Sequence, residues 1–298
     1  SNLISPFTSV FGNELDSNLY TESLIKYKEI PNLKLTNKNY LTEFEEDGFD
    51  LIIGNPPYGS KITKDDLKIL KCDLRFQEFG YEPSVLFSIK ALSQLKEGGR
   101  LVFILPSTLL RVASFSNFRK YLKNNTRINR IINLHQSFPD VGYETFVLDV
   151  VLEKQKKDYE IFINNFETKE KTELSFKFIE DRNVIPIHLD KKLENIINKI
   201  EKNTVKLSTI AEMPRGIAIS VSDNIILKKY KSNYIKLLTG RNIGKYYIKK
   251  APEHYVPSNY YHEKYKEKKI LSQNLAYKIV SALDTKGSLV NDTVNTIF

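Results

Sequence analysis

Apolar and polar positions alternate along the first half of the chain in a way that predicts short strands between helices. The runs Phe49 to Gly54 and Arg100 to Leu105 are continuous apolar segments that a proline closes, which is typical of buried strands. Apolar side chains recur with helical spacing over residues 83–96, and the pair Gly98-Gly99 is expected to end that helix. Similar patterns predict strands at residues 9–12, 128–134 and 145–153, and helices at residues 17–28 and 115–123, the first with Asp16 or Ser17 as its N-cap.

This alternation of strands and helices predicts an α/β domain with a mostly parallel sheet, in which ligands bind at the carboxyl ends of the strands. Residues 154–186 are polar and mixed and are expected to form a connection with some strand, and residues 187–202 predict a helix. Residues 205–298 contain short strand-like runs without a helical period. We therefore expect two domains, residues 1–186 and residues 187–298, of which the second is smaller, mixed and strand-rich.

Composition is that of a soluble globular protein, with 41% hydrophobic and 27% charged residues in a chain of 298. No apolar run reaches the length of about 18 residues that a membrane span needs, and residues 1–10 lack the features of a secretory signal. The single cysteine, Cys72, excludes an internal disulfide framework and fits a reducing cytoplasm, which is the expected location.

The positive charge is concentrated in the last third of the chain. Residues 201–298 carry 17 Lys and Arg against 8 Asp and Glu, which accounts for the whole net charge of +9. A basic domain beside a neutral one favours a polyanionic partner, most simply double-stranded DNA. The alternative is a lysine-rich but merely solvated surface.

The segment Asn55-Pro56-Pro57-Tyr58 is the strongest candidate for chemistry, because it follows the predicted strand 49–54 directly. The exocyclic amine of adenine is a poor nucleophile, since its lone pair is delocalised into the ring. The Asn55 side-chain oxygen and the Pro56 carbonyl could bind its two hydrogens and localise that lone pair, and the prolines would hold both acceptors rigid. Tyr58 offers a flat face for a base that has left the duplex. The alternative is that these residues form only a turn.

Residues 49–59 resemble the catalytic motif and strand of the gamma-class adenine DNA methyltransferases, in particular the TaqI-like group with an attached target recognition domain. This resemblance runs from about residue 9 to the end of the chain. It implies a Rossmann-like methyltransferase fold, S-adenosylmethionine as the cofactor, no metal, and methylation of a flipped adenine in a restriction-modification system.

The resemblance also implies cofactor-binding and base-binding residues. Glu14 matches an acidic residue that binds the cofactor ribose, and Asn39, followed by Tyr40, stands where the family usually has an Asp that accepts a hydrogen bond from the cofactor adenine. Phe87 matches an aromatic residue that packs on that adenine, although a core position on the helix 83–96 is an equal alternative. Phe138 matches an aromatic residue that packs on the flipped base opposite Tyr58.

Residues 205–298 resemble the recognition domain of the same group, more loosely than the catalytic motif does. Nine of the 17 tyrosines lie there among lysines, which suits contact with both phosphates and base edges. The candidate DNA-binding residues of this part of the chain are Arg215, Lys228, Lys229, Lys231 and Arg241.

Two departures from the family pattern lead us to expect a fragment truncated at both ends. The family has a Gly-rich cofactor loop ahead of the Glu14 segment, whereas the 13 residues before Glu14 contain no G-x-G pattern, and the recognition domain stops early. The expected consequences are a sheet without its middle strand, poor binding of S-adenosylmethionine, and dependence on a missing segment or a restriction subunit.

Three other functions remain open. A protein methyltransferase acting on a glutamine side-chain amide would use the same loop, although 240 residues follow Tyr58 here and the basic tail favours DNA. A non-catalytic DNA-binding fragment is the second alternative, because the Gly-rich loop is absent. A parent chain that also carries a nuclease domain is the third. The target sequence on DNA cannot be inferred from the residues.

Overall fold

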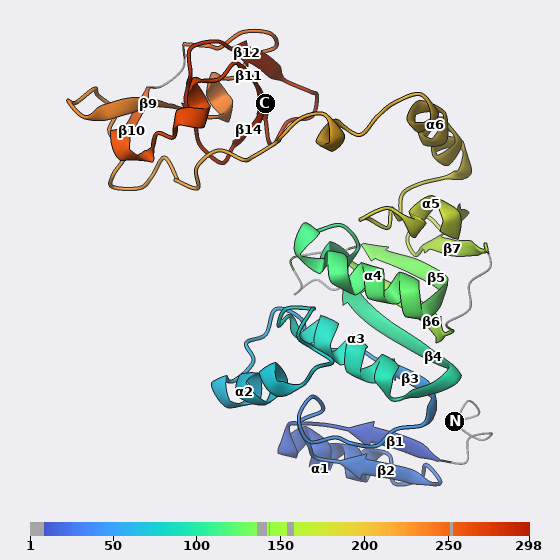
Figure 1. The fold of residues 1–298 in the computed structure, drawn as a ribbon. Coiled ribbons are helices and arrows are strands. Elements are labelled where there is room, and N and C mark those ends of the chain that lie inside the picture. The colour runs from blue at the N-terminus through green and yellow to red at the C-terminus, as the bar shows by residue number, and fades with distance from the viewer. Residues whose placement is uncertain (1–8, 136–141, 143, 154–157, 251–252) are drawn as a thin grey trace. The chain divides into compact units, whose positions relative to one another are not determined.

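The computed structural model describes residues 9–135, 142, 144–153, 158–250 and 253–298, which divide into two compact units, Ser1–Lys199 and Ile200–Phe298 (Figure 1). The division lies within the helix α6 (Lys191–Lys202), C-terminal to the position expected from the sequence. Its cause is that Ile187, Leu189 and Ile197 still pack against the hydrophobic core of unit 1.

A six-stranded mixed sheet forms the centre of unit 1, with the strand order β3-β4-β6-β5-β7-β8. The pairs β3–β4 and β5–β7 are parallel, whereas β6 runs antiparallel to both of its neighbours and β8 is antiparallel to β7. The expectation of a mostly parallel sheet was therefore wrong. The strands are β3 (Phe49–Gly54), β4 (Leu95–Pro106), β5 (Thr126–His135), β6 (Thr145–Leu152), β7 (Glu160–Asn165) and β8 (Lys171–Ser175).

A second, two-stranded parallel sheet pairs β1 (Val10–Asn13) with β2 (Leu33–Thr36). The ring of Phe11 in β1 meets the ring of Phe49 in β3 edge to face, with 5.4 Å between the centroids. Among the described residues no strand pairing joins β1 to β3, so the contact between the two sheets is made by side chains.

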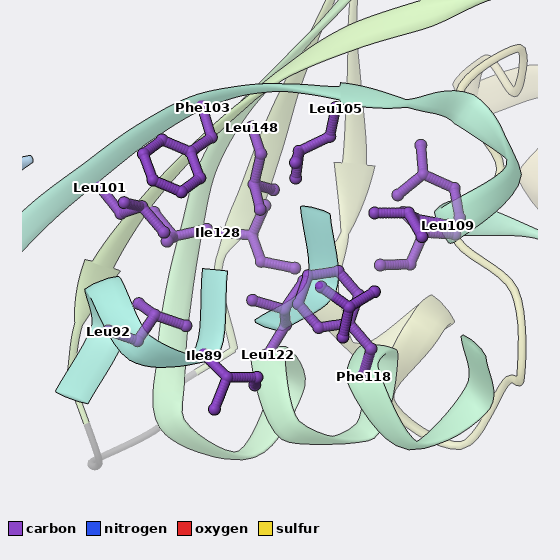
Figure 2. Packing of buried hydrophobic residues seen from close by; sticks show 14 of the residues in the cluster. Ile89, Leu92, Leu101, Phe103, Leu105, Leu109, Phe118, Leu122, Ile128 and Leu148 are labelled. Atoms are coloured by element: carbon purple, nitrogen blue, oxygen red, sulfur yellow. The ribbon is translucent and has the colours of Figure 1, made fainter. Parts of the chain in front are cut away.

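Helices cover one face of the large sheet. The helices of unit 1 are α1 (Ser17–Lys26), α2 (Lys64–Cys72), α3 (Pro83–Ser93), α4 (Ser116–Asn125), α5 (Phe176–Glu180) and α6, with 3-10 turns η1 (Ser107–Leu110) and η2 (Ala113–Phe115). Figure 2 shows Leu101, Phe103 and Leu105 of β4 facing Ile89 and Leu92 of α3 and Phe118 and Leu122 of α4. This apolar layer belongs to the hydrophobic core of unit 1 and holds the strands and helices together.

One helix ends earlier than its pattern suggested. Helix α3 stops at Ser93, and Gly98-Gly99 lies inside strand β4. Gly98 adopts a left-handed φ of +78°, and a Cβ on Gly99 would approach the Phe49 carbonyl to 2.9 Å. The glycines are therefore needed for a bend in the strand, not for a helix end.

Unit 2 contains two three-stranded sheets, β10-β9-β13 and β12-β11-β14. Its strands are β9 (Tyr234–Leu238), β10 (His254–Pro257), β11 (Lys269–Gln273), β12 (Ser281–Asp284), β13 (Leu289–Val290) and β14 (Val294–Ile297), and its 3-10 turns are η3 (Leu207–Thr209), η4 (Gly240–Asn242), η5 (Ser258–Tyr260) and η6 (Glu263–Lys266). Two small apolar clusters, centred on Leu271 and on Leu237, hold these sheets together.

Candidate active site

The segment Asn55-Pro56-Pro57-Tyr58 follows the carboxyl end of β3 and belongs to no helix or strand. Asn55 is exposed, Pro56 is buried and Tyr58 is half-buried. Because proline lacks a backbone N–H, strand pairing ends at Gly54, which is the last β3 residue in register with β4. The buried Pro56 therefore anchors a loop whose Asn55 side chain is accessible to a substrate.

A carboxylate of helix α3 fixes the far end of this loop. The backbone N–H of Gly59 donates to Oε1 of Glu82 over 3.0 Å, and the Ser84 hydroxyl donates to the same oxygen over 3.2 Å. Glu82 is the N-cap residue of α3, and Gly59 has a left-handed φ of +68° that suits glycine. Sequence reasoning missed Glu82, because its distance of 23 residues from Gly59 gives no local signal.

Glu14 and Asn39 lie at the carboxyl ends of the parallel strands β1 and β2. The backbone N–H of Glu14 donates to the Thr36 carbonyl over 3.0 Å, and the Asn37 side chain donates to the Glu14 carbonyl over 2.7 Å. One carboxylate oxygen of Glu14 accepts from the Asp16 N–H over 2.9 Å, which leaves capacity for further hydrogen bonds. The Asn39 side-chain oxygen accepts from the Leu41 N–H over 3.1 Å and retains one lone pair.

Tyr40 and Phe87 pack on one another, with 4.9 Å between the ring centroids, and both lie against the core of unit 1. The Tyr40 hydroxyl donates to the Gln94 side chain over 2.6 Å, and burial raises the pKa of that hydroxyl above its ordinary value. The ammonium of Lys90 lies 5.4 Å from the Tyr40 ring centre. Both aromatic residues therefore have structural contacts, and their roles toward a cofactor remain predictions.

A group of buried polar atoms lies at the ends of three neighbouring strands of the large sheet. Thr145 is paired with Pro106 of β4 on one side and with His135 of β5 on the other. The Thr145 and Ser107 hydroxyl oxygens, the Asn133 side-chain nitrogen and Nε2 of His135 are buried and have no hydrogen-bond partner among the described residues. Buried polar atoms are rarely left unpaired. The sequence did not predict this group of polar side chains at the edge of the sheet.

Phe138, which the sequence assigned to the base pocket opposite Tyr58, lies outside the described residues. A cavity of about 330 Å³ does occur in unit 1, but it is lined by residues such as Asn165, Thr172 and His188 near the end of β7. In the strand order β7 is separated from β3 by β4, β6 and β5, so this cavity does not adjoin Asn55.

The candidate DNA-binding residues of unit 2 lie in different segments, and no hydrogen bond or ion pair of the described residues joins one of them to another. Arg215 donates to the Asp292 carbonyl over 3.3 Å, and exposed Arg241 lies in the turn η4. Lys228, Lys229 and Lys231 are exposed, and the Lys231 ammonium lies 5.8 Å from the Tyr234 ring centre. Their solvent exposure is compatible with phosphate binding.

The described residues contain neither a metal-binding cluster nor a membrane-spanning helix. Within them no group of three or more His, Cys, Asp or Glu side chains is arranged to hold a metal ion. In the same part of the chain no helix has the length and apolar character required to cross a membrane.

Comparison with known proteins shows what this arrangement is similar to. Residues 8–139 match the family described as Eco57I restriction-modification methylase, so this segment is related to restriction-modification methyltransferases. Among curated proteins, the type II methyltransferase M.HincII of Haemophilus influenzae is 27% identical over 168 residues, which cover 55% of this chain and 32% of that protein.

Other relatives extend the similarity. The type II restriction enzyme and methyltransferase RM.Eco57I of Escherichia coli is 26% identical over 240 residues, which cover 75% of this chain and 23% of that protein. The chain therefore spans about a third or less of the length of these relatives.

Among solved structures, the type IIL restriction-modification enzyme MmeI has a TM-score of 0.53 at 11% identity, covering 94% of this chain and 46% of that one. The type IIG restriction endonuclease BpuSI has a TM-score of 0.52 at 12% identity, and the match covers 97% of this chain and 47% of that one. At these identities the structures show a shared fold.

Proposed function

We propose that this chain is part of a DNA methyltransferase that transfers a methyl group from S-adenosylmethionine to the exocyclic amine of adenine. The observation that carries the proposal is the Asn-Pro-Pro-Tyr loop at the carboxyl end of β3, with Asn55 exposed and Pro56 buried. The match of residues 8–139 to restriction-modification methylases supports it. The finer assignment to the gamma-class, TaqI-like enzymes, with the adenine flipped out of the duplex, rests on the residues of the loop.

The chemistry assigned to this loop requires two acceptors at fixed positions. The Asn55 side-chain oxygen and the Pro56 carbonyl accept the two amine hydrogens, so that the nitrogen lone pair becomes available for attack. The hydrogen bond between Gly59 and Glu82 keeps the loop from relaxing when substrate binds. The half-buried ring of Tyr58 offers a stacking face to the base.

The residues at the ends of β1 and β2 fit an adenosyl group. The half-buried carboxylate of Glu14 has an oxygen able to accept hydrogen bonds from ribose hydroxyls, and the Asn39 oxygen has one free lone pair for an adenine amine. The cofactor, when bound, supplies an electrophilic methyl group. The basic residues of unit 2, including Lys228, Lys229, Lys231, Arg215 and Arg241, would bind the DNA phosphates.

Methylation mapping tests the proposal. DNA from cells that express the full-length protein is sequenced for N6-methyladenine, beside DNA from cells that express the Asn55→Ala variant. We expect methyladenine at one short recurring sequence with the parent protein and none with the variant, because loss of a preorganised acceptor costs about 3 kcal/mol or more in the barrier. Methylated protein glutamine with unmethylated DNA would favour the alternative substrate instead.

A further inference from the structure

The loop that joins β11 to β12 in unit 2 presents three apolar side chains to solvent. Leu275 is 91% exposed, Tyr277 is fully exposed and Ile279 is 88% exposed. Three highly exposed apolar side chains within five residues of one loop differ from the scattered single residues that occur on any protein surface. This loop, residues 274–280, is called the β11–β12 tip below.

The base of the β11–β12 tip is held firmly. The backbone N–H of Gln273 donates to the Val280 carbonyl over 3.0 Å, and this bond closes the hairpin formed by β11 and β12. Asn274 donates its backbone N–H to the Thr293 carbonyl over 2.9 Å and its side-chain amide to the Asp292 carbonyl over 3.3 Å. The exposed side chains therefore project from a fixed support, and little ordering would be needed before they contact a partner.

A second aromatic segment lies next to this support. The N–H of Tyr246 donates to the Ser281 carbonyl over 2.7 Å, which joins residues 244–247 to the first residue of β12. Tyr246 is 82% exposed and has a left-handed φ of +73°, which is uncommon for a non-glycine residue. The ammonium of Lys245 lies 5.4 Å from the Tyr246 ring centre. The hydrogen bond thus brings exposed aromatic and basic side chains to the base of the tip.

The charge around the tip is mainly positive, with Asp292, whose carbonyl accepts from Asn274, as an acidic exception. Residues 241–250 and 268–283 together carry seven Lys and Arg and no Asp or Glu. Lys269 is buried against Asp284 at 2.8 Å, so six cationic side chains remain to attract a partner. Apolar side chains on a positively charged surface suit a polyanion with an apolar interior, and duplex DNA has both properties.

We propose that the β11–β12 tip is an apolar wedge that enters DNA, with Leu275, Tyr277 and Ile279 contacting the bases and the surrounding lysines contacting the phosphates. The proposal rests on the proposed function, since it assumes that the protein acts on DNA. It goes further by naming the segment of unit 2 that reaches the base pairs. Insertion of apolar side chains between base steps is a known way for proteins to open and bend a duplex.

A tryptophan reporter tests the proposal, because the chain contains no tryptophan. The Tyr277→Trp variant carries one indole at the tip, and the Tyr27→Trp variant carries one at an exposed position of unit 1, 40% exposed, that is not among the candidate DNA-binding residues. A short mixed-sequence duplex is titrated into each variant of the 298-residue chain at several salt concentrations. We expect the emission of the Tyr277→Trp variant to be quenched strongly through base stacking, and that of the control variant to change little.

Affinity gives the second readout. The triple variant Leu275→Ala, Tyr277→Ala, Ile279→Ala should bind the duplex about tenfold more weakly with an unchanged salt slope, because apolar contacts release no counterions. A control triple variant at exposed apolar positions elsewhere in unit 2, Val205→Ala, Ile210→Ala, Val221→Ala, should bind like the parent. Circular dichroism confirms that all variants fold.

Two results would contradict the proposal that the tip is a wedge. Undiminished DNA affinity of the triple tip variant, together with unquenched emission of the Tyr277→Trp variant, shows that the tip does not enter DNA. A triple tip variant that sediments as a smaller species than the parent, with unchanged DNA affinity, shows that the tip binds a second copy of the chain. Failure of the proposed function is distinguished from both, since the parent chain itself would then not bind the duplex.

Discussion

The N–H of Gly59 and the carboxylate of Glu82 form a 3.0 Å hydrogen bond that joins the end of the Asn-Pro-Pro-Tyr loop to the start of helix α3. Glu82 thereby ties the loop to the first turn of α3, where Ser84 donates to the same carboxylate oxygen. Because α3 is packed against the sheet through buried side chains such as Leu86 and Ile89, the bond connects the candidate loop to the rigid core.

The first prediction concerns this bond. Glu82→Ala in the full-length protein should lower kcat about tenfold or more while leaving the affinity for DNA nearly unchanged, because a hydrogen bond to a charged group contributes about 1.5–3 kcal/mol. Glu82→Gln keeps an oxygen acceptor and should recover most of the activity. Single-turnover methyl transfer on a duplex substrate, with KM measured separately, provides the check. Equal loss in both variants would show that the negative charge matters and the acceptor does not.

The second prediction concerns the exposed lysines of unit 2. Changing Lys228, Lys229 and Lys231 to Glu should weaken binding to all DNA sequences and flatten the salt dependence of the affinity, because fewer phosphate counterions are released. Fluorescence titration at several salt concentrations measures both effects. If the slope is unchanged, these lysines do not contact DNA, and the basic residues around the β11–β12 tip become the principal phosphate-binding group.

The sequence indicated those features that depend on neighbouring residues. Strand β3 and its closing prolines were predicted, and Asp16 is confirmed as the N-cap of α1, where its carboxylate accepts from the N–H groups of Asn18 and Leu19. Local patterns suffice in these cases because a proline or a capping carboxylate acts within a few residues.

Features that depend on distant residues were missed or misread. Strand β2 was not expected, since Leu33–Thr36 is too short to show a period and is stabilised by pairing with β1. The direction of β6 depends on its two neighbours in the sheet, not on its own residues. Helix α2 (Lys64–Cys72) was likewise not assigned from the sequence. For the candidate site, the loop was found from sequence, whereas Glu82 required the fold.

The third prediction concerns Arg119, a helix residue that the sequence would place at the surface. It is only 1% exposed, and its guanidinium donates to the carbonyls of Leu109, Val112 and Asn183. Burial lowers the pKa of Arg119 from its ordinary value. Arg119→Leu should destabilise unit 1 by about 3 kcal/mol, since three carbonyls lose their donor.

Thermal unfolding followed by circular dichroism tests the effect of Arg119→Leu, with Lys120→Leu as the control at the neighbouring exposed position of the same helix. An Arg119→Leu melting temperature equal to that of the control would show that the three carbonyls find other partners.

The last prediction concerns the buried ion pair of unit 2. The Lys269 ammonium and the Asp284 carboxylate are 2.8 Å apart, and both side chains are fully buried. Burial acts to raise the pKa of Asp284, but hydrogen bonds from Lys269 and from the N–H groups of Lys286 and Ser288 outweigh it and hold the pKa below its ordinary value of 3.8.

This direction fixes the sign of the pH dependence. A group whose pKa is lower in the folded state stabilises the fold at every pH above its unfolded pKa, and the contribution is lost as the pH falls below 3.8 toward the folded value. Asp284→Asn removes the charge at neutral pH and leaves the Lys269 ammonium buried without a counterion. We therefore expect it to destabilise unit 2 by about 3 kcal/mol at neutral pH, and by progressively less in acid. The exposed pair of Lys266 and Glu263 supplies the control, and Glu263→Gln should leave the free energy of unfolding nearly unchanged. Urea unfolding of both variants across the acid range measures the difference, and an Asp284→Asn variant as stable as the parent at neutral pH would contradict the assignment.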